Sequence, residues 1–185
     1  MTLLILGVAL WSFAHLAKRL VPHFHRAMQG SEKPMVTGML VVAIVLMVLG
    51  YRAAPVVALY TPMPGMGHLN NLLLLIAIFL FGVGGTKGTL YPRMRHPMLT
   101  GMILWAVAHL LVNGDLASVV LFGGLAAWAI TEIVVINRAG PWKRPTDGRG
   151  IKGDLMNLAG ALILFGLIAG VHIWLGHNPF LGTYP

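Results

Sequence analysis

The stretch PMLTGMILWAVAHLLVNGDLASVVLFGGLAAWAITEIVVIN, which runs from Pro97 to Asn137, decides the fold. It consists of two apolar segments joined at Asn113-Gly114-Asp115, a short turn signal. About 20 predominantly apolar residues cross a bilayer as a helix. Because so short a turn joins antiparallel neighbours, the stretch predicts two packed transmembrane helices.

Composition extends this prediction to the whole chain of 185 residues. Apolar residues make up 57% of it, charged residues 10%, and the mean hydropathy is +0.81. A soluble domain carries about 25% charged residues, so we exclude a soluble protein and predict a single all-α transmembrane domain over residues 1–185. The absence of cysteine excludes disulfides, zinc–thiolate sites and iron–sulfur clusters. We identify no internal repeat.

Six apolar stretches are expected to form membrane-spanning helices. They cover residues 3–20, 35–51, 68–84, 97–112, 115–137 and 154–175. The first is expected to be retained and not cleaved as a signal peptide, because its basic residues follow the apolar stretch. Gly166 and Gly170 form a Gly-x-x-x-Gly pair, which is typical of a close contact between helices in lipid.

Basic residues predict the orientation, because Lys and Arg collect in short cytoplasmic loops. Of 13 such residues, only Arg52 falls outside the connections that follow the first, third and fifth stretches. The others are Lys18, Arg19, Arg26, Lys33, Lys87, Arg93, Arg95, Arg138, Lys143, Arg144, Arg149 and Lys152. We therefore expect a bacterial inner-membrane protein with both termini outside, and basic loops that face lipid headgroups and not nucleic acid.

Histidines supply most of the polar chemistry near the predicted helices. They are His15, His68, His109 and His172 within or at the edge of the stretches, His96 just before the fourth, and His23, His25 and His177 outside them. Glu132 is the only acid well inside a stretch, which excludes paired-carboxylate chemistry. Ionisable residues in membrane helices mark candidate functional sites, and imidazole is a common ligand of haem iron.

His15 and His109 form the candidate pair of axial ligands, with His172 in reserve. With a rise of about 1.5 Å per residue, His15 lies about 18 Å and His109 about 6 Å below the outer surface. A tilted haem plane bridges this difference of about 12 Å. The alternative role of each histidine is a hydrogen bond to a neighbouring helix.

Other side chains on the same helix faces suit a haem. Trp11 and Trp105 are candidates to pack on the macrocycle, or else to anchor the helices at the membrane interface. Lys18, Arg19 and Arg95 are candidates to pair with the propionates near the inner surface.

The segment from Arg95 to Asp115 resembles the signature of the NnrU family. It reads R-H-P-x-L-x-G-x-x-x-W-x-x-A-H-L-x-x-N-G-D and is followed by L-F-G at residues 121–123. The string Gly-Tyr-Arg-x-x-Pro at residues 50–55 agrees in outline. The resemblance implies a role in, or alongside, bacterial reduction of nitrite and nitric oxide, with that reductase machinery as a partner.

This family also resembles the plant 15-cis-zeta-carotene isomerase, a membrane protein that carries haem b. The resemblance implies haem b as cofactor, His15 and His109 as its ligands, and His96 in a supporting role. It also implies the alternative of haem-dependent cis–trans isomerisation of an apolar membrane substrate such as a carotenoid. Ala106 stands where that isomerase has a cysteine, so thiolate ligand exchange is excluded here.

A second alternative comes from the Arg-His-Pro-x-x-x-Gly string at residues 95–101, which also resembles membrane methyltransferases that use S-adenosylmethionine. The downstream segment, residues 131–138, lacks the tyrosines and the second glutamate of those enzymes.

Overall fold

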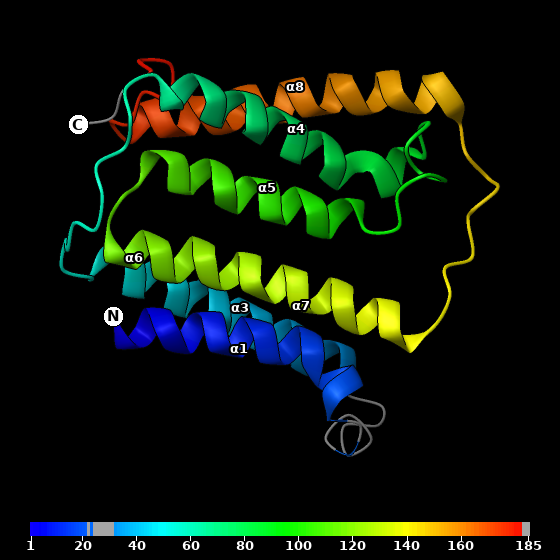
Figure 1. Cartoon of the computed structure of the whole chain (residues 1–185), viewed down its shortest axis with the longest axis horizontal. Coiled ribbons are helices and arrows are strands. Elements are labelled where there is room, and N and C mark those ends of the chain that lie inside the picture. Colours follow the sequence, from blue (N-terminus) through cyan, green and yellow to red (C-terminus); the bar gives the residue numbers. More distant parts are fainter. Residues whose placement is uncertain (22, 24–31, 183–185) are drawn as a thin grey trace.

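The computed structural model describes residues 1–21, 23 and 32–182, and these form an all-helical protein (Figure 1). His25 and Arg26 lie outside the described residues. A π-helical segment, Val119–Gly123, joins α6 to α7. The α-helices are α1 (Thr2–Leu20), α3 (Glu32–Arg52), α4 (Met66–Thr86), α5 (Pro97–Val112), α6 (Leu116–Ser118), α7 (Gly124–Ala139) and α8 (Gly150–Trp174).

Within the described residues, five helical segments are long and apolar enough to cross a membrane. They are α1, α3, α4, the continuous segment of α6, the π-helix and α7, and α8. The sixth expected span, α5, has the predicted bounds but only 16 residues. At 1.5 Å per residue it is about 24 Å long, which is shorter than a hydrocarbon core of about 30 Å. The chain therefore carries the helices of a multi-pass membrane protein, and the count of six spans stays a prediction.

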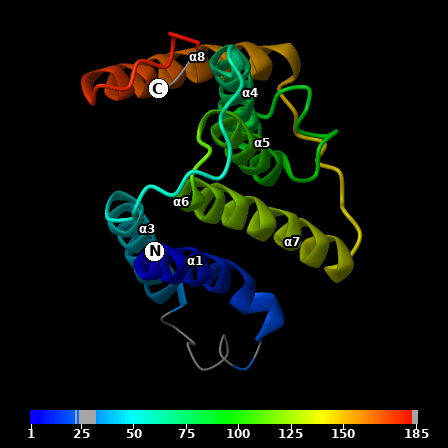
Figure 2. The ribbon, with the colours of Figure 1, turned by 60° about the vertical axis from the view of Figure 1, so that its left-hand side comes forward.

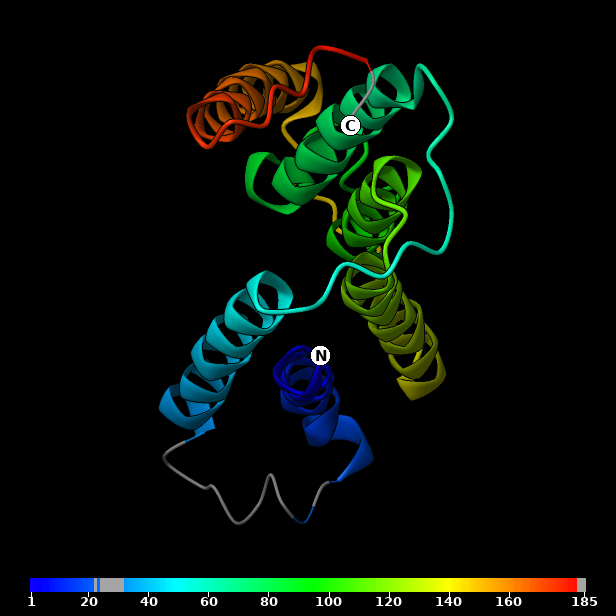
Figure 3. The ribbon, with the colours of Figure 1, turned by 90° about the vertical axis from the view of Figure 1, so that its left-hand side faces the viewer.

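The helices do not pack in chain order. Contacts run from α3 to α1, then to α7, α5, α4 and α8. Figure 2 shows α8, α4 and α5 grouped together, with α7 between this group and the α1–α3 pair. Figure 3 shows the same two groups nearly end-on, joined by the segment that follows α3.

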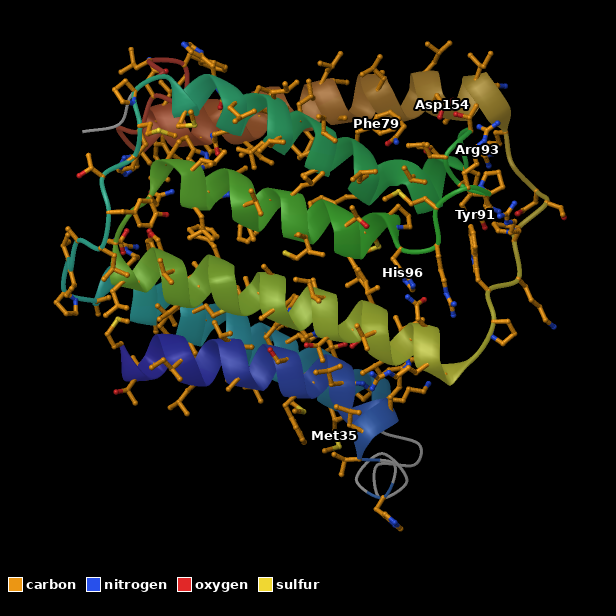
Figure 4. The ribbon with its side chains drawn as sticks, viewed as in Figure 1. Met35, Phe79, Tyr91, Arg93, His96 and Asp154 are labelled. Atoms are coloured by element: carbon orange, nitrogen blue, oxygen red, sulfur yellow. The ribbon has the colours of Figure 1, made fainter. Side chains whose placement is uncertain are left out.

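The N-terminus and the last residues that the structure describes, which follow α8, lie at the end of the molecule where α5 turns into α6 (Figure 1). We call this the Asn113 end. Figure 4 labels Arg93 and His96 at the opposite end, which we call the basic end. This arrangement agrees with the charge pattern of the sequence, while the side of the membrane that each end faces stays a prediction.

Glycines bring α1 and α3 together. A Cβ atom on Gly50 would lie 2.3 Å from the backbone nitrogen of Leu4, so only glycine permits this approach. The Gly166–Gly170 pair behaves differently, because a Cβ on either residue would meet nothing within 4 Å. The expectation that this pair marks a close helix contact is therefore wrong within the described chain.

Candidate functional site

A cavity of about 530 Å³ lies between α4, α5 and α8. Helix α4 packs against both of the others, which lie on either side of it (Figure 2). Large apolar and aromatic side chains make up most of the walls of the cavity, among them Phe81, Trp105, Phe122 and Phe165. Its polar side chains are Tyr51, Asn70, Asn71, His109, Asn113, His172 and His177. An apolar cavity with a few polar groups is typical of a small-molecule site.

His109 is held rigidly at this cavity. Its ring stacks on Phe122 at a centroid distance of 4.5 Å and an interplanar angle of 21°, and it packs against Trp105 at 4.7 Å. Its Nδ1 lies 2.8 Å from the carbonyl oxygen of Trp105, one turn earlier on α5. Because a carbonyl only accepts, Nδ1 carries the hydrogen, and the Nε2 of the neutral ring keeps a lone pair.

His172 brings a second imidazole to the same cavity from α8. Its Nδ1 lies 2.8 Å from the carbonyl oxygen of Ile168, so its Nε2 also keeps a lone pair. The cavity is therefore lined by one histidine from α5 and another from α8, each with Nε2 free to bind a metal or accept a hydrogen bond.

His15 does not line this cavity. Its ring packs between Trp11 and Trp128, at centroid distances of 4.6 Å and 4.5 Å, where α1 meets α7. Phe122, which contacts His109, and Trp128 are six residues apart, about 9 Å along one continuous helix. His15 and His109 therefore touch this helix at different levels.

The surroundings of His15 and His109 nevertheless share one local pattern. Trp-x-x-Ala-His occurs at residues 11–15 and again at residues 105–109. In both copies the histidine Nδ1 bonds to the tryptophan carbonyl, and the ring centroids lie 4.6 Å and 4.7 Å apart. Ala14 and Ala108 are buried in both. The expectation of no internal repeat overlooked this five-residue signal.

Arg19 is engaged away from the cavity, where it forms an ion pair of 2.8 Å with Glu132. The Glu132 side chain is buried, and its second oxygen has no hydrogen-bond partner among the described residues. Trp11 and Trp128 contact each other between the same two helices, at a centroid distance of 5.5 Å. Arg19 thus neutralises the carboxylate that sequence alone placed inside a membrane helix.

Arg95 and His96 hold the basic end together. Arg95 donates to the carbonyl oxygens of Ile136 and Gly140, at 3.2 Å and 2.8 Å. His96 Nε2 lies 2.9 Å from Asn137 Oδ1. The Ile136 carbonyl lies in the last turn of α7, where carbonyls have no partner within their own helix, and Gly140 is the residue directly after that helix. Figure 4 shows His96 at this end, so the Arg-His-Pro string clamps α5 to α7.

The turn Asn113-Gly114-Asp115 closes the other end of the site. Asn113 donates from Nδ2 to the carbonyl oxygen of His109 at 2.8 Å. A Cβ on Gly114 would lie 1.9 Å from the Tyr60 carbonyl oxygen, which explains the glycine. Burial raises the pKa of Asp115, but hydrogen bonds from Ser118 and from the backbone of Asp115 and Ala117 together outweigh burial and hold that pKa below its ordinary value.

A bare metal ion lacks a suitable set of ligands in the part of the chain that the structure describes. No three His, Asp or Glu side chains come together there, and the sequence has no cysteine. The histidines are therefore placed to act singly or in pairs, as they do toward a prosthetic group that brings most of its own ligands.

Comparison with known proteins gives one match. No curated protein and no solved structure matches the chain. The family model described as NnrU protein matches residues 3–179, which cover the described helices apart from the first residue of α1. The chain belongs to the NnrU family.

Proposed function

We propose that this chain is a membrane protein that binds haem b and acts in, or alongside, bacterial reduction of nitrite and nitric oxide. Membership of the NnrU family supports the nitrogen-oxide setting. The observation that carries the haem proposal is the presence of His109 and His172 in one apolar cavity, each with its Nε2 uncommitted.

The side chains of the cavity fit haem. Neutral imidazole is the usual protein ligand of haem iron, and an Nδ1 hydrogen bond to a carbonyl fixes the ring and raises its basicity. His109 and His172 would hold the iron, Trp105 and Phe122 would keep the His109 ring in position, and the apolar walls would exclude water. Bound haem would supply one-electron redox chemistry.

The expected propionate partners lie elsewhere. Arg19 pairs with Glu132, and Arg95 caps α7, so neither lines the cavity. The cavity offers Asn113 and His177 for this role.

The pair predicted from sequence, His15 and His109, is the second arrangement that we propose. The repeated Trp-x-x-Ala-His pattern supports it, because in both copies the ring packs against the tryptophan whose carbonyl oxygen its Nδ1 bonds. In this arrangement the continuous helix that carries Phe122 and Trp128, which contact the His109 and His15 rings respectively, would have to move for one iron to bind both nitrogens.

Absorption spectra of detergent-purified protein test both arrangements. The protein is compared oxidised and dithionite-reduced, as wild type and as His109→Ala, His172→Ala and His15→Ala. We expect a sharp reduced α-band that shifts or disappears in His109→Ala and His172→Ala and persists in His15→Ala. Loss in His15→Ala with an intact His172→Ala spectrum would replace the cavity pair by the sequence-derived pair.

His96→Ala is the matched control, because His96 lies at the basic end and bonds to Asn137. It is expected to leave the spectrum unchanged. A colourless wild type after expression with ample haem would refute the cofactor. Deletion in a denitrifying host is expected to slow nitrite or nitric oxide reduction, and unchanged rates would refute that role.

Isomerisation of a polyene is a second candidate function, favoured by the length of the cavity. Its lining follows α4 from Asn70 to Phe81, which is about 16 Å of helix. Chromatography of a cis-polyene incubated with the purified protein tests this, and unchanged isomer ratios would refute it. No contact favours a methyltransferase, because Arg95 and His96 are both bonded to α7 or its end.

A further inference from the structure

The polar and apolar parts of the cavity are separated along its length. Tyr51 lies at the end of α3, and Asn70 lies within about one turn of the start of α4, both near the Asn113 end. Leu74, Ile78 and Phe81 continue the wall along α4 toward the basic end. A molecule that fills this cavity therefore has a polar group near the Asn113 end and an apolar body beyond it.

A chain of hydrogen bonds fixes which atom Asn70 leaves unpaired. Asn71 Nδ2 donates to the Pro179 carbonyl oxygen at 2.7 Å, and because a carbonyl only accepts, the orientation of the Asn71 amide is determined. Asn71 Oδ1 in turn accepts from Asn70 Nδ2 at 3.3 Å. Asn70 Oδ1 is then an acceptor, and it has no partner among the described residues although Asn70 is only 4% exposed.

Tyr51 presents the same kind of atom. Ser118 donates its hydroxyl hydrogen to the Asp115 carboxylate at 2.6 Å, so the 2.8 Å bond between Tyr51 and Ser118 has Tyr51 as its donor. The Tyr51 oxygen then keeps only lone pairs. His109 and His172 likewise keep lone pairs on Nε2, as described above. Asn70 Oδ1 and the Tyr51 oxygen are thus acceptors near the Asn113 end of the cavity that do not depend on either histidine.

We propose that the cavity binds an elongated apolar molecule whose polar end is a hydroxyl group, with Asn70 Oδ1 as the acceptor of that hydroxyl. A buried acceptor without a partner is unfavourable, and a ligand that donates to it removes that penalty. A ketone or an ether of the same shape leaves the acceptor unpaired. The inference names a ligand class for the cavity of the proposed function, but it rests on hydrogen bonding and not on bound haem.

Competition binding in nanodiscs tests the proposal on the full chain. Tritiated 1-dodecanol is the probe, and unlabelled 1-dodecanol, its methyl ether and 4-decylphenol are the competitors. We expect the ether to compete about tenfold more weakly than the alcohol, as the loss of one hydrogen bond in an apolar site predicts. Stronger competition by 4-decylphenol than by unlabelled 1-dodecanol would indicate an aromatic hydroxyl ligand, such as a hydroquinone, and weaker competition would indicate an aliphatic one.

Variants separate binding at Asn70 from partitioning into lipid. Asn70→Leu is expected to bring the alcohol and the ether to equal potency, and Asn70→Ala serves the same purpose if the leucine variant does not fold. Thr131→Val is the control, because Thr131 is exposed on α7 and bonds only within its own helix. It is expected to keep the preference of the wild type.

Equal potency of alcohol and ether on the wild type would overturn the inference, as would an unchanged preference in both Asn70 variants. Failure here is distinguishable from failure of the proposed function. A colourless protein that prefers the alcohol refutes only the haem, whereas a haem protein that does not discriminate refutes only the hydroxyl ligand.

Discussion

Replacing Arg19 with methionine is expected to destabilise the protein more than replacing Glu132 with glutamine, although both changes break one ion pair. The Glu132 side chain is 7% exposed and that of Arg19 is 38% exposed. Arg19→Met therefore leaves a carboxylate among apolar side chains, with its Oε2 already unpaired among the described residues. Glu132→Gln leaves a guanidinium near the basic end of α1, where water reaches it.

The magnitudes follow from this asymmetry. Deleting one partner of a fully buried ion pair lowers the free energy of unfolding by about 3–5 kcal/mol. Because Arg19 is partly exposed, the loss expected for Arg19→Met is at the lower end of this range, about 3 kcal/mol. Glu132→Gln keeps the shape and one acceptor, so about 1 kcal/mol is expected. The double variant Arg19→Met, Glu132→Leu replaces the pair by apolar contact and is expected to lose less than Arg19→Met alone.

Unfolding in mixed micelles with increasing sodium dodecyl sulfate, followed by circular dichroism, measures these free energies. Arg138→Met is the matched control, because Arg138 is exposed in the last turn of α7, and a change within about 0.5 kcal/mol is expected. An Arg19→Met loss no larger than that of Glu132→Gln would refute the reasoning, as would a loss in the double variant no smaller than that of Arg19→Met alone.

Three further changes test the fold. Gly50→Ala is expected to cost about 1–3 kcal/mol in the same assay because its Cβ meets the α1 backbone, whereas Gly166→Ala, in open space, is expected to be neutral. Because the pKa of Asp115 is depressed in the folded chain, its carboxylate stabilises the fold at pH values above its ordinary pKa of 3.8, and this stability is lost as the pH falls through the folded pKa. Asp115→Asn is expected to flatten this acid dependence of the melting temperature, and an unchanged profile would contradict the prediction. Arg95→Lys is expected to lower the melting temperature, since one ammonium replaces a guanidinium shared by two carbonyls, and an equal melting temperature would count against the clamp.

Element positions were predictable because a bilayer demands long apolar segments. The bounds of α5 match the prediction, and those of the other helices differ by at most a few residues. The turn at Asn113 was predictable from three residues, because Asp115 caps the start of α6 through a local hydrogen bond. The close approach of Gly114 to the Tyr60 carbonyl is a distant contact that the sequence does not reveal. The all-α class is confirmed for the same reason.

The order in which the helices pack was not predictable from the sequence. An apolar helix face can contact either lipid or another helix, so the sequence does not reveal which faces meet. Only the packing of α4 against both α5 and α8 brings His109 and His172 to one cavity. Depth estimates put His15 and His109 at different levels. The structure adds that both rings contact one continuous helix, His109 at Phe122 in its π-helical segment and His15 at Trp128 in α7. The expectation for the pair Gly166–Gly170 was wrong for the same reason, since the spacing of two glycines does not reveal whether another helix lies beside them.

The π-helical segment between α6 and α7 has a consequence for the spacing of the chain. A π-helical turn holds one residue more than an α-helical turn, so it absorbs an insertion without rotating the flanking faces. Deleting one residue between Val119 and Gly123 would restore a continuous α-helix and keep Asp115 and Glu132 in phase. Deleting one residue between Gly124 and Trp128 would instead rotate Glu132 by about 100° relative to the preceding turns, away from Arg19. We therefore expect the deletion between Val119 and Gly123 to lower the free energy of unfolding less than the deletion between Gly124 and Trp128, which breaks the contact between α1 and α7.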